Sequence, residues 1–190
     1  TAGLPTLMRN WSEYVWLVND MVETGFINTI REIWWDVRPH HNFGSVEVRV
    51  CDMAGNLDDV LALTALIQCL VKGLSDQIDE GAYQHDCHPM MVRQNKWRAS
   101  RFGNQAQLVN SYTFEVQSVS ENIEDVIHRL HAIGVELSCL DYLQDNQRIA
   151  DQPGWAARQR TLLEETEDPA EVVRQLTSAS RVDIPVNTSS

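Results

Sequence analysis

Lysine is scarce in this 190-residue chain: only Lys72 and Lys96 are lysines among its 15 cations. The other cations are arginines, whose planar guanidinium pairs with carboxylates and phosphates through parallel hydrogen bonds. The net charge of −12 argues against non-specific binding to nucleic acid. An acidic protein can still bind a small anion, but only where its cations are concentrated locally.

Closely spaced cysteines and long apolar runs are also missing. The cysteines at positions 51, 69, 87 and 139 form no CxxC pair, which is typical of a reduced, cytoplasmic protein rather than a disulfide scaffold. No apolar run approaches the roughly 18 residues of a membrane helix, and the first residues do not form a signal peptide. We therefore expect no membrane partner. Because the chain begins at Thr1 rather than Met, we expect a piece of a longer protein or a processed product.

Several common motifs are absent as well. The sequence contains no GxxxxGK[ST], no GxGxxG after a predicted strand, no GxSxG and no internal repeat. If the protein handles ATP, its phosphates must be held by a metal ion and arginines, because no glycine-rich loop is available to cradle them.

Helical periodicity dominates what is present. Apolar spacings of three and four predict a helix over residues 7–23, with Pro5 and Thr6 at its start and Gly25 at its end. Asn56 is a good N-cap for a core helix over residues 57–74, and a polar loop should follow to about residue 91. Further helices are predicted near residues 92–100, 121–132, 134–146, 153–166 and 169–180.

Two segments with a period of two interrupt the helices. In REIWWDVRPH, residues 31–40, apolar side chains alternate with polar ones, and Pro39 should end the strand. SVEVRVCD, residues 45–52, places three valines on one face: Val46, Val48 and Val50. The glycine-containing link HHNFG predicts an antiparallel hairpin. Two strands alone make a poor sheet, so the apolar face should need strands from elsewhere.

The polar face of this hairpin is a candidate site. It gathers two carboxylates and two arginines, which are Asp36, Glu47, Arg38 and Arg49. His40 and His41 lie at the turn. A carboxylate on a rigid strand suits Mg²⁺, and a neighbouring arginine can hold phosphate oxygens, with Trp34 and Trp35 shielding the site from water. The alternative is an ordinary solvated sheet face, where exposed charge pairs contribute little.

Two further clusters contain potential ligands. RQNKWRASRFG, residues 93–103, contains four cations within nine residues: Arg93, Lys96, Arg98 and Arg101. This cluster could be an anion site or a solvated basic face. HDCH, residues 85–88, matches no familiar zinc spacing, and His128 and His131 are expected to be surface residues.

Several of these segments together resemble the second glutamate–cysteine ligase family of carboxylate–amine ligases. IWWDVRPHHNFGSVEVRVCD is similar to that family's Trp-Trp-Asp-x-Arg-Pro segment followed by Thr/Ser-x-Glu-x-Arg-x-x-Asp, with Ser45 where threonine is commoner. NKWRASRFG resembles its Asn-x-Trp-x-Ala-x-Arg-x-Gly segment, and RQR at residues 158–160 also fits. The order and spacing agree over nearly the whole chain.

The resemblance implies an α+β fold like the catalytic domain of glutamine synthetase, with an antiparallel sheet flanked by helices. It also implies ATP-dependent joining of the γ-carboxylate of glutamate to an amine such as cysteine, with Mg²⁺ and ATP as cofactors. By the same resemblance Glu47 is a metal ligand, and Arg49 and Arg38 are catalytic and hold nucleotide or phosphate. Asn95, Arg98 and Arg101 match positions that bind the cofactor or brace the site.

The family's N-terminal half, with a Gly-x-Glu-x-Glu strand and a His-x-His segment, has no counterpart here. We therefore expect residues 1–190 to be the C-terminal part of a single ligase domain, whose partner is that missing half. Two other interpretations stay open: a ligase of the same fold that uses another amine, and a non-catalytic helical module whose hairpin completes a partner's sheet. A homo-oligomer is also possible, because unpaired strand edges favour association.

Overall fold

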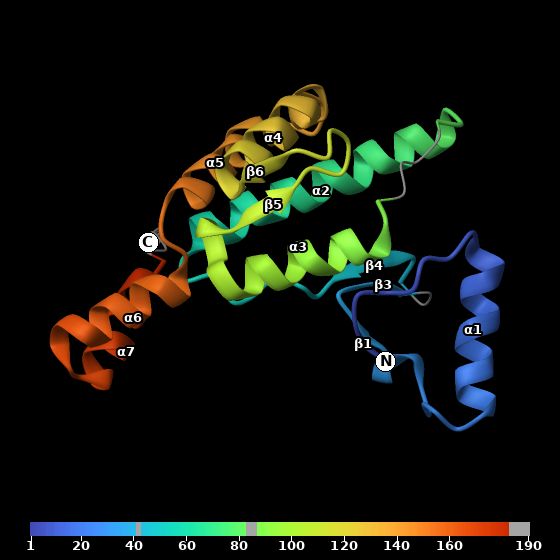
Figure 1. The fold of residues 1–190 in the computed structure, drawn as a ribbon, viewed down its shortest axis with the longest axis horizontal. Helices are drawn as coiled ribbons and strands as arrows, with labels where there is room; N and C mark the ends of the chain where they lie inside the picture. Colours follow the sequence, from blue (N-terminus) through green and yellow to red (C-terminus); the bar gives the residue numbers. More distant parts are fainter. Residues whose placement is uncertain (41–42, 83–86, 183–190) are drawn as a thin grey trace, which may run out of the picture. The chain divides into compact units, whose positions relative to one another are not determined.

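The computed structural model describes residues 1–40, 43–82 and 87–182, which divide into two compact units, Thr1–Met53 and Ala54–Ser190. The predicted α+β class is confirmed, since the described residues are mostly helical and carry short strands (Figure 1). These strands form three separate two-stranded sheets, so the glutamine-synthetase-like sheet stays a prediction. The assignment of the chain to a single ligase domain stays a prediction as well.

The first unit surrounds a small aromatic core. Helix α1 (Trp11–Glu23) packs Tyr14 against Ile27, Ile33 and Trp35. Strand β1 (Ala2–Gly3) pairs in parallel with β2 (Trp34–Trp35), and the 3₁₀ helix η1 (Ile30–Glu32) precedes β2. The predicted start of the first helix is wrong: α1 begins after Asn10, whose side chain accepts a hydrogen bond from the Glu13 backbone N–H and thereby caps the helix.

The predicted hairpin is confirmed, but the strand predicted over residues 31–40 is not continuous: the stretch begins in η1, continues as β2 and reaches the hairpin only at Val37. Strand β3 (Val37–His40) pairs antiparallel with β4 (Ser45–Val48), and the register places Arg38 opposite Glu47. Pro39 does not end the strand as predicted but lies within β3, opposite Val46. Proline is tolerated in this pair because a two-stranded sheet has only edge strands.

The second unit is built on three long helices. Helix α2 (Leu57–Asp79) packs against α4 (Val119–Glu136) and α5 (Leu140–Asp151), and Figure 1 shows these helices together. Small residues permit close packing: an added Cβ at Gly73 would lie 2.8 Å from Ile133, and one at Gly134 would lie 3.0 Å from Leu143. Ser118 and Glu121 form a capping box that fixes the start of α4.

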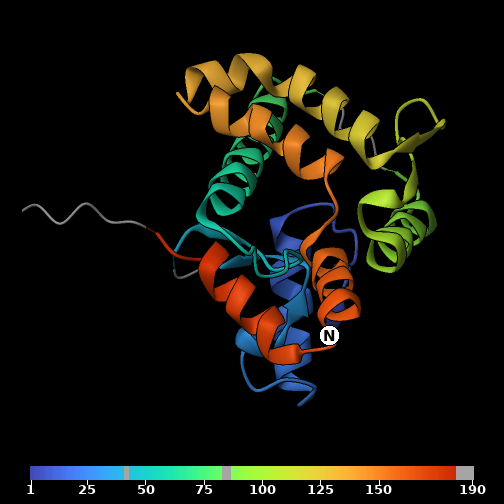
Figure 2. The same ribbon diagram turned by 90° about the vertical axis from the view of Figure 1, so that its left-hand side faces the viewer.

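The remaining elements of this unit are shorter. Helix α3 (Pro89–Phe102) and the 3₁₀ helix η2 (Gly103–Gln105) lead into β5 (Gln107–Val109), which pairs antiparallel with β6 (Val116–Ser118). Helices α6 (Trp155–Thr166) and α7 (Pro169–Ala179) lie side by side (Figure 2). In the described ranges, no helix is both long and apolar enough to cross a membrane.

Several predicted boundaries in this unit are wrong. Helix α2 continues to Asp79, so the polar loop expected after residue 74 is much shorter. The break expected near residue 133 falls at residues 137–139, because Gly134 stays helical and Ser138 adopts φ 55°. Pro169 opens α7 as predicted, whereas α6 begins at Trp155, after Gly154 and not at Pro153.

Candidate functional site

Glu47 lies between two arginines on one face of the β3–β4 hairpin. Arg38 Nε donates to Glu47 Oε2 at 2.6 Å from the neighbouring strand, and Arg49 Nη1 donates to Glu47 Oε1 at 2.8 Å. These hydrogen bonds, the one from Arg38 above all, hold the pKa of the Glu47 carboxyl below its usual range. The structure therefore brings three of the predicted site residues together and keeps Glu47 ionised.

Arg38 is the most buried member of this group. It is only 7% exposed, and its Nη1 donates to the carbonyl oxygens of Ile30, Arg31 and Ile33 at 3.1, 3.2 and 2.8 Å. One guanidinium thus binds Glu47 and the carbonyl groups at the end of η1. Arg38 positions Glu47, because the backbone contacts hold its guanidinium in place.

Arg49 lies at the more open side of the same face. Its guanidinium carbon is 4.9 Å from the centre of the Trp34 indole, which is 60% exposed. A cation held over an indole face is attracted to it and loses conformational freedom. Trp34 and Glu47 therefore hold the Arg49 side chain from two directions.

The apolar face of the hairpin is exposed. Val46 is 51% exposed, and Val37 and Val50 are exposed as well, whereas Arg38 on the polar face is buried. The alternative of an ordinary solvated polar face is therefore wrong for Arg38, because its backbone contacts bury it. The exposed valines agree with the expectation that this face needs further partners.

The second predicted cluster lies in the Ala54–Ser190 unit, where two of its members hold α3 to β5. The Asn95 side-chain amide donates to Val109 O at 2.8 Å and accepts from Val109 N at 2.9 Å. Arg98 Nη1 donates to Gln107 O at 2.9 Å, and Arg101 is exposed. Asn95 and Arg98 thus have bracing contacts, and the cofactor role of all three residues stays a prediction.

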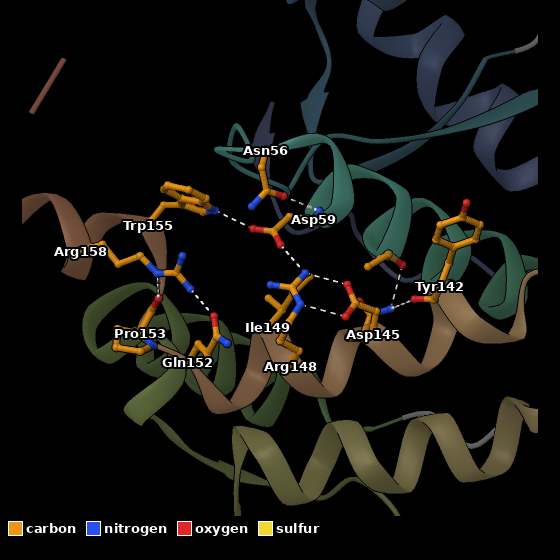
Figure 3. Close-up of polar contacts among 12 residues, drawn as sticks. Asn56, Asp59, Tyr142, Asp145, Arg148, Ile149, Gln152, Pro153, Trp155 and Arg158 are labelled. Atoms are coloured by element: carbon orange, nitrogen blue, oxygen red, sulfur yellow. Dashed lines mark hydrogen bonds and ion pairs between the residues drawn. The ribbon is translucent and has the colours of Figure 1, made fainter. Parts of the chain in front are cut away.

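The second unit contains a buried polar network that the sequence patterns do not indicate. Asp59 is 4% exposed, and its carboxylate accepts from Arg148 Nη2 and Trp155 Nε1, both at 2.7 Å (Figure 3). Arg148 also binds Asp145 through Nε at 2.8 Å and Nη2 at 2.6 Å, and holds the pKa of the Asp145 carboxyl below its usual range. The network fixes the starts of α2 and α6 to the end of α5.

The network extends to the RQR segment at residues 158–160, which is one of the segments that resemble the ligase family. Arg158 lies over the Trp155 indole at 4.9 Å, and its Nε donates to Pro153 O at 2.7 Å (Figure 3). The Trp155 ring leaves no room for a side chain at Gly55, where an added Cβ would lie 2.4 Å from it. Arg158 therefore has a structural role at the start of α6.

Replacing Asp59 with alanine should destabilise the second unit by about 2 kcal/mol. The substitution removes the buried carboxylate that accepts hydrogen bonds from Arg148 and Trp155, and leaves these two donors without it. Urea unfolding followed by circular dichroism measures the loss. Asp145→Ala is the matched control: this carboxylate binds the same arginine but is 32% exposed, so its loss should cost under about 1 kcal/mol. Equal losses of unfolding free energy in the two variants would contradict a larger stabilising contribution from the buried Asp59 carboxylate.

The residues that the structure describes do not fit a metal site by themselves. Among the described residues, no group of three or more His, Cys, Asp or Glu side chains could hold a metal ion. Glu47 is a single carboxylate whose two oxygens already accept from arginines. Of the HDCH segment, His85 and Asp86 lie outside the described residues, as does His41, while His88 caps α3 by accepting from Met90 N.

The fold and the hairpin define the class: a mostly helical α+β chain with an arginine-bracketed carboxylate on a short antiparallel hairpin. The model of "Glutamate-cysteine ligase family 2(GCS2)" matches residues 1–178. The chain belongs to this family, and the resemblance found in the sequence is confirmed.

Curated relatives agree with this assignment. A protein of Gloeobacter violaceus named "Putative glutamate--cysteine ligase 2" is 39% identical over 176 residues, which cover 93% of this chain and 47% of that protein. A protein of Arthrobacter sp. named "Putative glutamate--cysteine ligase 2-1" is 39% identical over 165 residues, which cover 87% of this chain and 43% of that protein. The chain therefore spans about half the length of the curated relatives it matches.

Proposed function

We propose that this chain forms part of an ATP-dependent ligase that joins the γ-carboxylate of glutamate to an amine such as cysteine. The observation that carries the proposal is the ionised Glu47 held between Arg38 and Arg49 on the hairpin. Family membership supports the glutamate and cysteine substrates, since the matched relatives bear that name. ATP, Mg²⁺ and the acyl phosphate are part of the proposal.

The arginines suit the chemistry of such a reaction. A carboxylate is a poor acyl donor, so ATP converts it to an acyl phosphate, which the amine then attacks with release of phosphate. Positioned arginines stabilise the charge that develops on the transferring phosphoryl oxygens. Arg49 is the group we assign to this task, because Arg38 is already bound to three backbone carbonyl groups.

Mg²⁺, when bound, would neutralise charge on the transferred phosphoryl group. Glu47 could contribute one ligand oxygen, because each carboxylate oxygen has a lone pair beyond the one that accepts from an arginine. The described residues do not complete such a site, so the proposal needs ligands from outside them. Within the second cluster we assign nucleotide binding to Arg101, which is exposed, while Asn95 and Arg98 brace its helix.

The proposal is tested with a chimera in which this chain replaces the matching region of the Gloeobacter violaceus relative. The assay follows ADP release and requires that it depend on both glutamate and the amine. Comparison of cysteine with other amines then identifies the acceptor. A folded chimera without glutamate-dependent ADP release would contradict the proposal.

Arg49→Lys in the chimera should lower kcat by about tenfold or more, with a smaller change in the KM for ATP. Lysine keeps the positive charge but loses the planar fork, and an interaction made chiefly in the transition state affects kcat. Steady-state kinetics with ATP varied separates the two constants. Arg9→Lys, at an exposed arginine of the same unit, is the control and should change neither. A raised KM with unchanged kcat would make Arg49 a nucleotide-binding residue only.

The exposed valine face favours one other candidate function. Val46 and Val50 could let the hairpin complete the sheet of a partner protein without any catalysis. In that case the folded chimera would release no ADP when glutamate and the amine are added.

A further inference from the structure

Two thiols meet in the helical core of the second unit. Cys69 Sγ on α2 lies 3.6 Å from Cys139 Sγ, although the two residues are 70 positions apart in the sequence. Cys69 is fully buried beside Leu130 and Leu143, whereas Cys139 is half-buried. Both thiols are reduced in the structure.

The positions of the two residues allow a bond to form between them. A disulfide has sulfur atoms about 2 Å apart, so the observed contact must shorten by roughly 1.6 Å. Cys139 lies outside a helix, in the short connection between α4 and α5, where Ser138 adopts a positive φ. Side-chain rotation and a small shift of this connection can close the gap without moving α2.

We propose that Cys69 and Cys139 form a reversible oxidation site at which a hydroperoxide converts the two thiols to a disulfide. The Cys139 sulfur attacks one peroxide oxygen, the O–O bond breaks, and a sulfenic acid and one water or alcohol are formed. The Cys69 sulfur then attacks the Cys139 sulfur, the S–O bond breaks, and hydroxide leaves with the Cys69 proton as water. The two thiols lose two electrons, and the peroxide gains two.

The surroundings of the two sulfurs fix the order of these steps. Cys69 is inaccessible to a peroxide in solution, while Cys139 has solvent contact. Burial also raises the pKa of the Cys69 thiol to about 11, so Cys69 is protonated at neutral pH and is a poor first nucleophile. Cys139 therefore reacts first, and Cys69 resolves the sulfenic acid that it touches.

The disulfide should stabilise the unit. It joins α2 to the connection between α4 and α5 and closes a loop of about 70 residues, which restricts the unfolded chain strongly. We expect the melting temperature to rise by about 5 °C or more on oxidation and to return when dithiothreitol is added.

The test treats residues 1–190 with a small excess of hydrogen peroxide and then blocks the remaining thiols. The expected product has lost two hydrogens and two titratable thiols, and digestion should give a linked peptide pair containing Cys69 and Cys139. Cys51→Ser, at an exposed cysteine of the first unit, is the control and should behave like the parent. Cys69→Ser should stop at the sulfenic acid of Cys139, which a dimedone reagent traps.

Cys139→Ser should leave Cys69 reduced, because the peroxide cannot reach the buried thiol. Linkage of other cysteines, oxidation of Cys69 in the Cys139→Ser variant, or oxidation of the parent to sulfinic acids without a linked pair would overturn the proposal. A disulfide that forms without raising the melting temperature would overturn the stabilising role.

Discussion

Glu47→Gln should reduce turnover of the chimera to less than about a tenth of the parent at saturating Mg²⁺. Glutamine keeps the size of the side chain but loses the negative charge that Arg38 and Arg49 share. A neutral amide is also a weak ligand for Mg²⁺, which prefers charged oxygens. The substitution therefore removes the group that orders Arg49 and the one ligand that the hairpin can contribute.

The fold should survive this change, and that separates a catalytic effect from unfolding. Arg38 keeps its hydrogen bonds to three backbone carbonyls, so the end of η1 and the hairpin register stay in place. Circular dichroism and the melting temperature test this directly. Glu23→Gln, at an exposed acid of α1, is the control and should leave turnover unchanged. Turnover by Glu47→Gln above a tenth of the parent would rule out the proposed role of Glu47.

The hairpin was predictable because its signal is local. Alternation with a period of two assigns Glu47 and Arg49 to one face within a few residues, and the short glycine-containing link indicates antiparallel pairing with the strand that carries Arg38. The burial of Arg38 was not predictable, because it depends on carbonyl groups exposed where η1 ends. The end of η1 is a 3₁₀ turn, whereas the alternating pattern of residues 31–40 predicted a strand there.

Contacts between distant parts of the chain account for most of what sequence reasoning missed. Asp59 lies in the first turn of α2, and its partners Arg148 and Trp155 follow 89 and 96 residues later. Cys69 and Cys139 are likewise separated by 70 positions. Strands β5 and β6 have three residues each, too few for alternation to be distinguished from chance.

Helix ends were predicted well only where a single side chain sets them. Asn56 caps α2 as expected, since its side chain accepts from Asp59 N at 2.7 Å. The end of α4 depends instead on packing: Gly134 stays helical because α5 lies against it, which no pattern within residues 121–146 indicates. Tertiary contacts therefore override local preference at this boundary.

Residues 1–190 by themselves should show no ATP hydrolysis that depends on glutamate and an amine, whereas the chimera should show it. The reason lies in the hairpin, which offers Mg²⁺ one clear carboxylate. Mg²⁺ requires nearly octahedral oxygen ligands and gives up water reluctantly, so it would bind a lone carboxylate only weakly. The exposed valines of β3 and β4 lack sheet neighbours among the described residues, so the isolated chain should also tend to associate.

The comparison uses three proteins at equal concentration: residues 1–190 alone, the chimera, and the chimera carrying Glu47→Gln. ADP release is measured with and without glutamate and the amine, and light scattering reports association. Turnover should be robust only in the parent chimera, and only the isolated chain should associate. The relative's remaining residues supply both the missing ligands and the missing strands. Robust turnover by residues 1–190 alone would mean that the active site lies elsewhere in this chain, with ligands from segments such as HDCH.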